Sequence, residues 1–277
     1  MTLIVSYSEI FKWQTCQRQY YYRYHLGYAP VIDSGPMGLG IKGHKLLEVF
    51  YEALKSGLTK EESLKKTLET AEKIMREASI TDLSILKAWT LVDNYIRAND
   101  FTTEIELIEN RFLVPVSNFS DDPVMSDVQI GFTPDVVFRR NGGFLDIEDY
   151  KFTGRAWSQS KMNRFSQIKL YQIFLESMGY DISRTILRFF NTTTGKITIK
   201  PYTATAIEKE TLIRDFLAGV REVVMYRKGS LHYLAPRTVN YTACQFCKFE
   251  FPCTLEAEGK DASRTLEAEY VYHNRRR

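Results

Sequence analysis

The feature of this sequence that most restricts its fold is a predicted β-hairpin in the middle third of the chain. Residues 128–139 and 143–151 are rich in Val, Ile and Phe, as strands are, and Asn141-Gly142-Gly143 supplies a turn between them. Asp135 lies on one of these strands and Asp149-Tyr150-Lys151 near the end of the other. Because a short turn lays two antiparallel strands side by side, we expect both acidic positions in one site.

The hairpin carries residue types that suit metal-dependent hydrolysis. The two-residue period of a strand puts Asp149 and Lys151 on the same face. Together with Asp135, this aspartate offers an oxygen-rich site for Mg²⁺ or Mn²⁺, and a lysine beside the metal can position or deprotonate an attacking water. An Asp-x-Lys triplet is common by chance, and ordinary polar residues at a strand end are the competing interpretation. The catalytic interpretation therefore needs support from other segments.

The hydrophobic pattern elsewhere predicts one α/β core with helical and cysteine-rich additions. In the first third, helices are predicted from Ser8 and over 60–78 and 82–98, the last two capped by Thr59 and Thr81. The tail from about residue 228 is predicted to be irregular. The other predicted elements are strands over 105–117, 184–191 and 196–201 and helices over 162–178 and 204–227.

Further motifs stand around the hairpin in a defined order. Gly40-x-x-x-His44 lies on a predicted helix, although a lone histidine there is more often a core residue than a ligand. Glu109 lies on the strand before the hairpin, and Gln167-x-x-x-Tyr171 lies on the helix after it. In the order Gly-x-x-x-His, Pro-Asp, Asp-x-Lys and Gln-x-x-x-Tyr, these motifs resemble the RecB-like group of PD-(D/E)XK nucleases.

The resemblance covers roughly residues 6 to 253, and the segment from Ser6 to Tyr24 is similar to the opening segment of that group. Two positions depart from the common pattern: Gln17 stands where proline is usual, and the second acid is Asp149 rather than glutamate. The resemblance implies a restriction-endonuclease-like core, in which a mixed central sheet is flanked by helices. It also implies a single nuclease domain over 1–277, made of these three parts: a helical part over 1–103, the core over 104–227 and a cysteine-rich tail over 228–277.

The resemblance implies that six residues form a site for phosphodiester hydrolysis: His44, Asp135, Asp149, Lys151, Gln167 and Tyr171. The two aspartates would hold Mg²⁺ or Mn²⁺, and the histidine would be a further metal ligand or would organise the site. The lysine would stabilise or activate the attacking water, while the glutamine and the tyrosine would position the site and the DNA backbone. Glu48 and Glu109 would either support the site or form ordinary salt bridges.

Four cysteines suggest a second metal site. Cys244, Cys247 and Cys253 stand close together in the tail, and Cys16 lies far upstream. No stretch approaches the roughly 18 apolar residues of a membrane span, and the N-terminus lacks the pattern of a secretory signal, so we expect a cytoplasmic protein with reduced thiols. Thiolates at such spacing can hold zinc or an iron–sulfur cluster.

In part of the nuclease group, one cysteine before the core and a C-x-x-C-x-x-x-x-x-C after it bind a [4Fe–4S] cluster, and all four cysteines match that pattern. The resemblance therefore favours a [4Fe–4S] cluster, with Zn²⁺ as the alternative. Such a cluster would join the N-terminal helix to the tail, and its role would be structural.

The net charge of +3 is too small to identify a nucleic-acid partner, so a basic surface has to be local. Basic and aromatic residues that could follow a phosphate backbone and stack on an unpaired base come after the hairpin. They are Arg155, Trp157, Lys161, Arg164, Phe165 and Lys169. The alternative for each of them is an ordinary solvated helix face.

The predicted function is that of a metal-dependent exonuclease acting on single-stranded or resected DNA ends. The alternatives are a structure-selective endonuclease and a non-catalytic DNA-binding scaffold of the same fold. The resemblance points to recombination, repair, or phage and CRISPR DNA processing, with recombination, replication or CRISPR-adaptation proteins as possible partners and no membrane partner. The chain has no Gly-x-x-x-x-Gly-Lys-Ser/Thr loop, so ATP hydrolysis is not expected.

Overall fold

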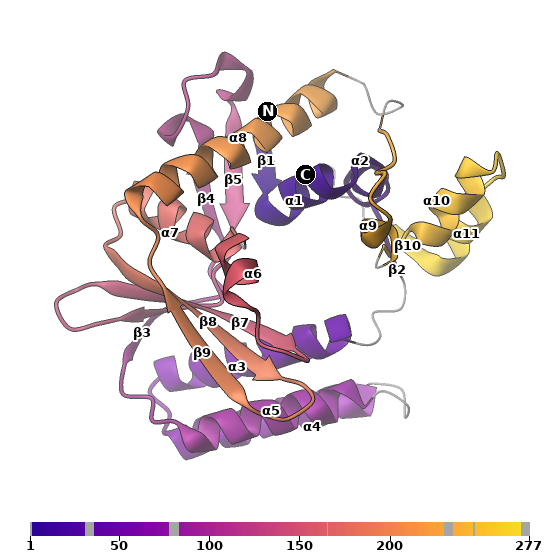
Figure 1. The fold of residues 1–277 in the computed structure, drawn as a ribbon. Coiled ribbons are helices and arrows are strands. Elements are labelled where there is room, and N and C mark those ends of the chain that lie inside the picture. Colours follow the sequence, from indigo (N-terminus) through magenta and orange to yellow (C-terminus); the bar gives the residue numbers. More distant parts are fainter. Residues whose placement is uncertain are drawn as a thin grey trace. The chain divides into compact units, whose positions relative to one another are not determined.

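The computed structural model describes residues 2–30, 36–77, 83–164, 166–229, 235–245 and 247–272 (Figure 1). The chain forms two compact units, each built from separate stretches of sequence. The terminal unit comprises Met1–Asp33, Leu113–Gly131 and Ile213–Arg277, and the central unit comprises Ser34–Phe112 and Phe132–Leu212. Among the helices of the described part of the chain, none combines the length and hydropathy needed to cross a lipid bilayer.

A five-stranded mixed sheet forms the middle of the central unit, with the strand order β3-β6-β7-β8-β9. The predicted hairpin is confirmed, because β6 and β7 pair antiparallel, with Val136 opposite Glu148. Strands β7 and β8 pair parallel, which makes the sheet mixed, as expected for the α/β class. The strands are β3 Glu104–Ile108, β6 Val136–Arg139, β7 Leu145–Thr153, β8 Ile182–Asn191 and β9 Ile197–Tyr202.

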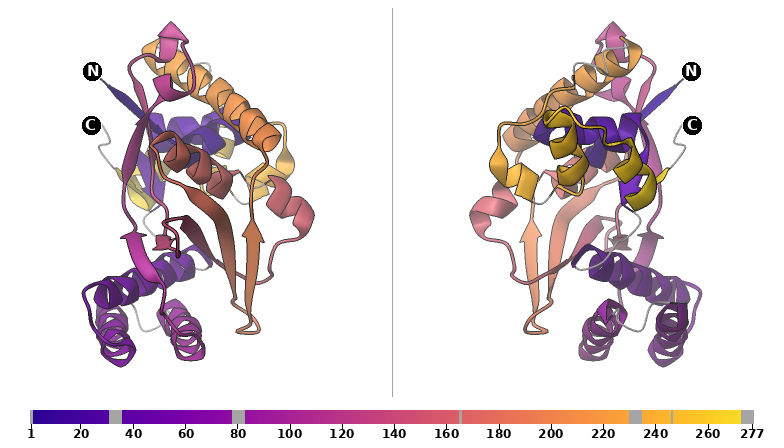
Figure 2. Two further views of the ribbon diagram at one scale, coloured as in Figure 1. Left: turned by 90° about the vertical axis from the view of Figure 1, so that its left-hand side faces the viewer. Right: turned by 90° about the vertical axis from the view of Figure 1, so that its right-hand side faces the viewer.

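Three helices of the central unit pack against one another below its sheet in Figure 1: α3 Pro36–Lys55, α4 Lys60–Glu77 and α5 Ser84–Ala98. Figure 2 shows the same trio from two further directions. The predicted cap at Thr59 is confirmed, since its Oγ1 accepts a hydrogen bond from the Glu62 amide at 3.2 Å and its own amide donates to the Glu62 carboxylate at 2.8 Å. Thr81 lies outside the described residues.

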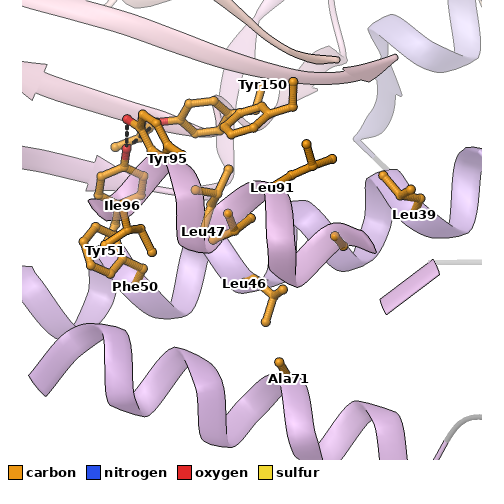
Figure 3. Close-up of a cluster of buried hydrophobic side chains, with 14 of the residues drawn as sticks. Leu39, Leu46, Leu47, Phe50, Tyr51, Ala71, Leu91, Tyr95, Ile96 and Tyr150 are labelled. Carbon is orange, nitrogen blue, oxygen red and sulfur yellow. Dashed lines mark hydrogen bonds between the residues drawn. The ribbon is translucent and has the colours of Figure 1, made fainter. Parts of the chain in front are cut away.

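The main core of the central unit lies between these helices and the sheet (Figure 3). Apolar side chains of α3 and α5, such as Leu47 and Val92, are fully buried there. Tyr150 projects into this core from β7. Because side chains alternate along a strand, Asp149 and Lys151 project from the opposite face of β7. The hydrophobic pattern thus fixes which face of the strand is left for polar chemistry.

Three predicted elements of the central part are interrupted. The strand predicted over 105–117 stops at Ile108, where Glu109 takes a left-handed φ of 44°, and resumes as β4 Phe112–Pro115. The strand predicted over 128–139 divides into β5 Val128–Phe132 and β6 around Pro134, which has no amide hydrogen for a sheet. The helix predicted over 162–178 divides into α6 Gln159–Arg164 and α7 Gln167–Ser177.

The terminal unit holds two smaller sheets, with the orders β1-β5-β4 and β10-β2. Its first helix is capped by Ser6, whose Oγ accepts a hydrogen bond from the Glu9 amide at 3.3 Å, so the predicted cap at Ser8 is wrong. The strands and N-terminal helices are β1 Leu3–Ser6, α1 Tyr7–Thr15, α2 Gln17–Tyr20, a π-helix at Tyr21–His25, β2 Tyr28–Pro30 and β10 Tyr270–Tyr272.

The tail is more ordered than predicted. It forms the short helices α9 Tyr241–Gln245, α10 Glu250–Ala257 and α11 Ser263–Glu269. A small core of Tyr22, Phe249, Leu266 and Tyr270 includes side chains at or beside α10 and α11, with Phe249 stacked between the rings of Tyr22 and Tyr270. This packing stabilises segments that carry little periodic signal of their own. The long helix α8 Ala206–Lys228 comes before the tail.

Candidate metal and catalytic site

Three predicted or suspected site residues of the central unit come together although they lie far apart in sequence. The Nδ1 atom of His44 is 3.4 Å from Oδ2 of Asp135 and 3.8 Å from Oε1 of Glu109. One ligand atom from each of the three residues lies within 4.8 Å of the others. An imidazole nitrogen with two carboxylate oxygens is a donor set that suits a divalent cation.

Two hydrogen bonds from backbone amides fix Glu109 and Asp135, one to a backbone carbonyl and one to a carboxylate. The amide of Glu109 donates to the carbonyl oxygen of Asp135 at 2.9 Å, and the amide of Tyr150 donates to Oδ2 of Asp135 at 2.7 Å. Both carboxylates therefore sit where the hydrogen-bonded ladder between neighbouring strands ends. The sequence left Glu109 open between a site role and a salt bridge, and its place beside His44 makes it a candidate metal ligand. Glu48 instead pairs with Lys45 at 2.9 Å.

The Asp-x-Lys pair lies deeper in the unit. The side chain of Asp149 is 2% exposed, and its Oδ2 atom lies 2.5 Å from Nζ of Lys151. The buried Oδ2 of Asp149 therefore faces the Lys151 ammonium directly. Burial raises the pKa of Asp149 to about 6; the charge of Lys151 lowers it, and that of Asp135 raises it again.

His44 faces these acids from α3. Burial by itself would lower its pKa, but hydrogen bonding to Asp135 and Glu109 and the negative charge of Asp149 outweigh burial and raise the pKa of His44 to about 10. The two aspartates and the histidine are thus within electrostatic reach of one another. The side chains of His44 and Glu109 are 30% and 31% exposed, so the site is open on one side.

Gln167 and Tyr171 lie one turn apart on α7, as predicted, and Nε2 of Gln167 donates to the phenol oxygen of Tyr171 at 2.7 Å. Burial raises the pKa of Tyr171, and the charge of Asp149 raises it further. The phenol is therefore neutral, and it lies close enough to Asp149 for the negative charge of that carboxylate to affect its pKa. It can act as a hydrogen-bond donor at the edge of the site.

The basic residues after the hairpin divide into two sets. Arg155 and Lys161 are exposed, and Nζ of Lys161 lies 4.2 Å from the ring centroid of Trp157. Lys169 is buried, 3.9 Å from Glu208 and above the ring of Tyr202, a placement that does not fit an exposed DNA contact. Arg164 ends α6, but its side chain and the whole of Phe165 lie outside the described residues.

The four cysteines all belong to the terminal unit, and each is half-buried with no disulfide. Burial raises the pKa of the Cys247 and Cys253 thiols, and the neighbouring Cys16 thiol raises both further, so these three lie near one another. Among the described residues, however, no three cysteine sulfurs lie within 4.8 Å of each other. The sulfurs around a tetrahedral zinc ion would be about 3.8 Å apart. The cysteines are therefore not clustered as tightly as a single ion requires.

Cationic side chains surround these thiols. The charge of Lys12 acts on Cys247, and those of Arg237 and Arg18 act on Cys253, in each case lowering the pKa of the thiol against the effect of burial. Both arginines also pair with Glu256, Arg237 at 3.3 Å. Positive charge near thiols favours the thiolate form, which is the form that binds metals.

A family model described as the PD-(D/E)XK nuclease superfamily matches residues 4–254 of the chain. The comparison with curated proteins finds no match. Among the solved structures that match is one titled "Crystal structure of SSO0001", which is 11% identical, has a TM-score of 0.42, and covers 90% of this chain and 84% of its own. At that score the likeness carries no further argument. The family match spans every residue of the site in the central unit.

Proposed function

Because the chain belongs to the PD-(D/E)XK nuclease superfamily, whose members are metal-dependent nucleases that act on DNA, we propose that it is an exonuclease of single-stranded or resected DNA ends. We place it in recombination, repair, or phage and CRISPR DNA processing, in the RecB-like branch. One observation carries the proposal: His44, Glu109 and Asp135 converge beside the buried Asp149–Lys151 pair.

Asp135, Asp149 and His44 would hold the divalent metal, with Glu109 as a fourth candidate ligand. The residues fit such an ion, because one ligand atom each of His44, Glu109 and Asp135 lies within 4.8 Å of the others, and these are the nitrogen and oxygen donors that Mg²⁺ and Mn²⁺ accept. When bound, the metal supplies Lewis-acid stabilisation of the negative charge on the scissile phosphate.

The protein's own groups have separate tasks in this proposal. The ammonium of Lys151, held against Asp149, orients the attacking water and stabilises the hydroxide that forms. The neutral phenol of Tyr171, fixed by Gln167, donates a hydrogen bond toward the phosphate. On the exposed segment that follows β7, Arg155 and Lys161 neutralise backbone phosphates and Trp157 stacks on a base. Lys169 has no part in this path because it is buried.

The test is degradation of end-labelled linear single-stranded DNA in Mn²⁺ or Mg²⁺ by wild type, Asp149→Asn and Asp146→Asn. Asp146 is a matched control: it is as buried as Asp149, lies on the same strand and projects from the other face. We expect wild type and the control to degrade DNA and Asp149→Asn to be inactive. A wild type that binds DNA but never cleaves it would favour the scaffold alternative.

A circular single strand separates the exonuclease from the endonuclease. An exonuclease needs an end, so the circle should stay intact while the linear strand of the same sequence is degraded. Cleavage of the circle at a comparable rate would reject the exonuclease proposal and favour a structure-selective endonuclease. The comparison uses the same metal and protein concentration for both substrates, so that differences in folding or loading cancel.

We also propose that Cys16, Cys244, Cys247 and Cys253 hold a [4Fe–4S] cluster in the terminal unit, with Zn²⁺ as the alternative. Two features support the cluster. The four cysteines match the pattern that binds a [4Fe–4S] cluster in part of the nuclease group. The cations Lys12, Arg18 and Arg237 are placed to offset the negative charge of four thiolates.

Iron, sulfide and zinc analysis of anaerobically purified protein tests this second proposal. We expect about four irons and four sulfides per chain, a visible absorption band, and loss of both in Cys247→Ser. Stoichiometric zinc without sulfide would replace the cluster by a zinc site. A protein that holds no metal at these cysteines under anaerobic conditions would overturn both.

A further inference from the structure

Three tyrosines of the central unit join their hydroxyl groups inside the hydrophobic core. Tyr51 of α3, Tyr95 of α5 and Tyr150 of β7 are at most 2% exposed. The phenol of Tyr150 donates to the Tyr51 oxygen at 2.9 Å, and the Tyr51 and Tyr95 oxygens are 2.8 Å apart. Figure 3 draws both hydrogen bonds and shows the three rings converging from two helices and one strand. We call this set the tyrosine chain.

The tyrosine chain is more than a way to fill the core. Phenylalanine at all three positions would occupy nearly the same volume without burying a polar atom, and a buried hydroxyl is tolerated only when it is hydrogen-bonded. A hydrogen bond, unlike an apolar contact, specifies distance and direction. Each hydroxyl of the chain therefore constrains where the ring that carries it can sit.

One end of the tyrosine chain reaches the proposed metal site through the backbone. Tyr150 is the residue between Asp149 and Lys151, and its amide donates to Oδ2 of Asp135 at 2.7 Å. Its side chain points into the core while its two neighbours point to the site, as alternation along β7 requires. Anchoring the Tyr150 ring thus fixes the amide that holds the carboxylate of Asp135. It also fixes the segment of β7 that carries Asp149.

The other end of the tyrosine chain lies beside a buried ion pair. Arg188 of β8 and Glu148 of β7 form two hydrogen bonds, at 2.9 and 3.0 Å, and the Arg188 guanidinium lies 5.0 Å from the centroid of the Tyr95 ring. The ion pair links β8 to β7, the strand that carries Tyr150. These two strands pair parallel. The Tyr95 ring is thereby held against a fixed cation.

We propose that Tyr51, Tyr95 and Tyr150 are positioning residues whose hydroxyl groups set the geometry of the metal ligands. The proposal rests on the metal site proposed above. Helices α3 and α5 contribute through it to metal affinity, because the Tyr51 hydroxyl bonds to those of Tyr95 and Tyr150 and so links both helices to β7. The predicted signature is weaker metal binding out of proportion to any loss of stability.

The test compares Mn²⁺ affinity, measured by calorimetry, with the urea midpoint for wild type, Tyr51→Phe, Tyr95→Phe, Tyr150→Phe and the control Ile96→Val. Ile96 lies in the same core beside Tyr95, so its truncation weakens the fold without removing a hydroxyl. Loss of groups that orient ligands usually weakens metal binding by about tenfold or more. We expect about that loss for Tyr51→Phe and less than twofold for Ile96→Val.

A double variant sharpens the comparison. Because the hydroxyls act as a chain, Tyr51→Phe should add little to the loss in affinity caused by Tyr150→Phe. Mn²⁺ binding of all three tyrosine variants within twofold of wild type, or a loss in Ile96→Val as large as theirs, would overturn the inference. Absence of Mn²⁺ binding by wild type would instead reject the proposed metal site, so the two failures are distinguishable.

Discussion

Gly43 of α3 lies directly against the ring of Phe152 of β7: a Cβ atom at position 43 would be 2.2 Å from Cζ of Phe152. Gly43 precedes His44, and Phe152 follows Lys151, so this contact sets how closely the helix with the histidine approaches the strand with the Asp-x-Lys pair. The motif glycine, Gly40, is different, because a Cβ there would have no atom within 4 Å. The sterically essential glycine is therefore Gly43.

We expect Gly43→Ala to destabilise the protein by about 1–3 kcal/mol, the usual cost of overpacking, because the Phe152 ring would have to shift from its stacked position on Phe190. Gly40→Ala should be neutral or stabilising by up to about 1 kcal/mol, since alanine favours helix. Urea unfolding of both variants measures this contrast. The double variant Gly43→Ala with Phe152→Leu should recover stability; without such recovery, the contact with Phe152 is not the cause.

Glu109 has a left-handed φ of 44°, which costs a residue with a side chain about 1–2 kcal/mol relative to glycine. We therefore expect the metal-free Glu109→Gly variant to be more stable than Glu109→Ala by about 1–2 kcal/mol, while both weaken Mn²⁺ binding. Glu106→Gln is the control, since Glu106 pairs with Arg139 on the same edge and does not belong to the ligand group. A Glu109→Gly variant that binds Mn²⁺ as wild type does would remove Glu109 from the site.

The ion pair of Arg188 and Glu148 is buried, with relative exposures of 8% and 4%. Arg188→Met should destabilise the protein by about 3–5 kcal/mol, because it leaves the Glu148 carboxylate buried without a cation. Adding Glu148→Leu should recover much of the lost stability, because the double variant no longer buries an uncompensated charge. Unfolding in urea tests both. If the double variant were less stable than the single one, desolvation of Glu148 would not explain the cost.

Glu208 offers a prediction about pH. Hydrogen bonds from the Tyr202 phenol and from the Thr205 amide, the latter at 3.0 Å, lower the pKa of this carboxyl to about 2. The pKa of Glu208 is lower in the folded protein than in the unfolded chain, where it is about 4.3. The ionised carboxylate therefore stabilises the fold above about pH 4.3, and this contribution is lost as pH falls toward 2. The stability difference between wild type and Glu208→Gln should therefore be constant near pH 7 and shrink below about pH 4. A difference that persists at pH 2 would contradict the assignment.

The sequence by itself determined the parts of the site that depend on local geometry. The Asn141-Gly142-Gly143 turn predicted the β6–β7 hairpin, and strand alternation placed Asp149 and Lys151 on one face. Helical spacing predicted that Gln167 and Tyr171 would meet, and Thr59 was predicted as the cap of the helix that follows it. In each case the relevant contacts join residues within one element or across one short turn, where the backbone period alone sets the distance.

Only the tertiary structure decided which distant residues join the site. Glu109 joins the candidate ligand group because the chain breaks after β3, which places its carboxylate beside His44. Lys169, which was predicted to contact DNA, is instead buried near Glu208. The tyrosine chain likewise joins two helices and a strand through contacts that no periodicity encodes. Such placements are set by packing between elements. The burial of apolar faces fixes how the helices pack on the sheet, and this packing then determines which polar side chains lie close enough to interact.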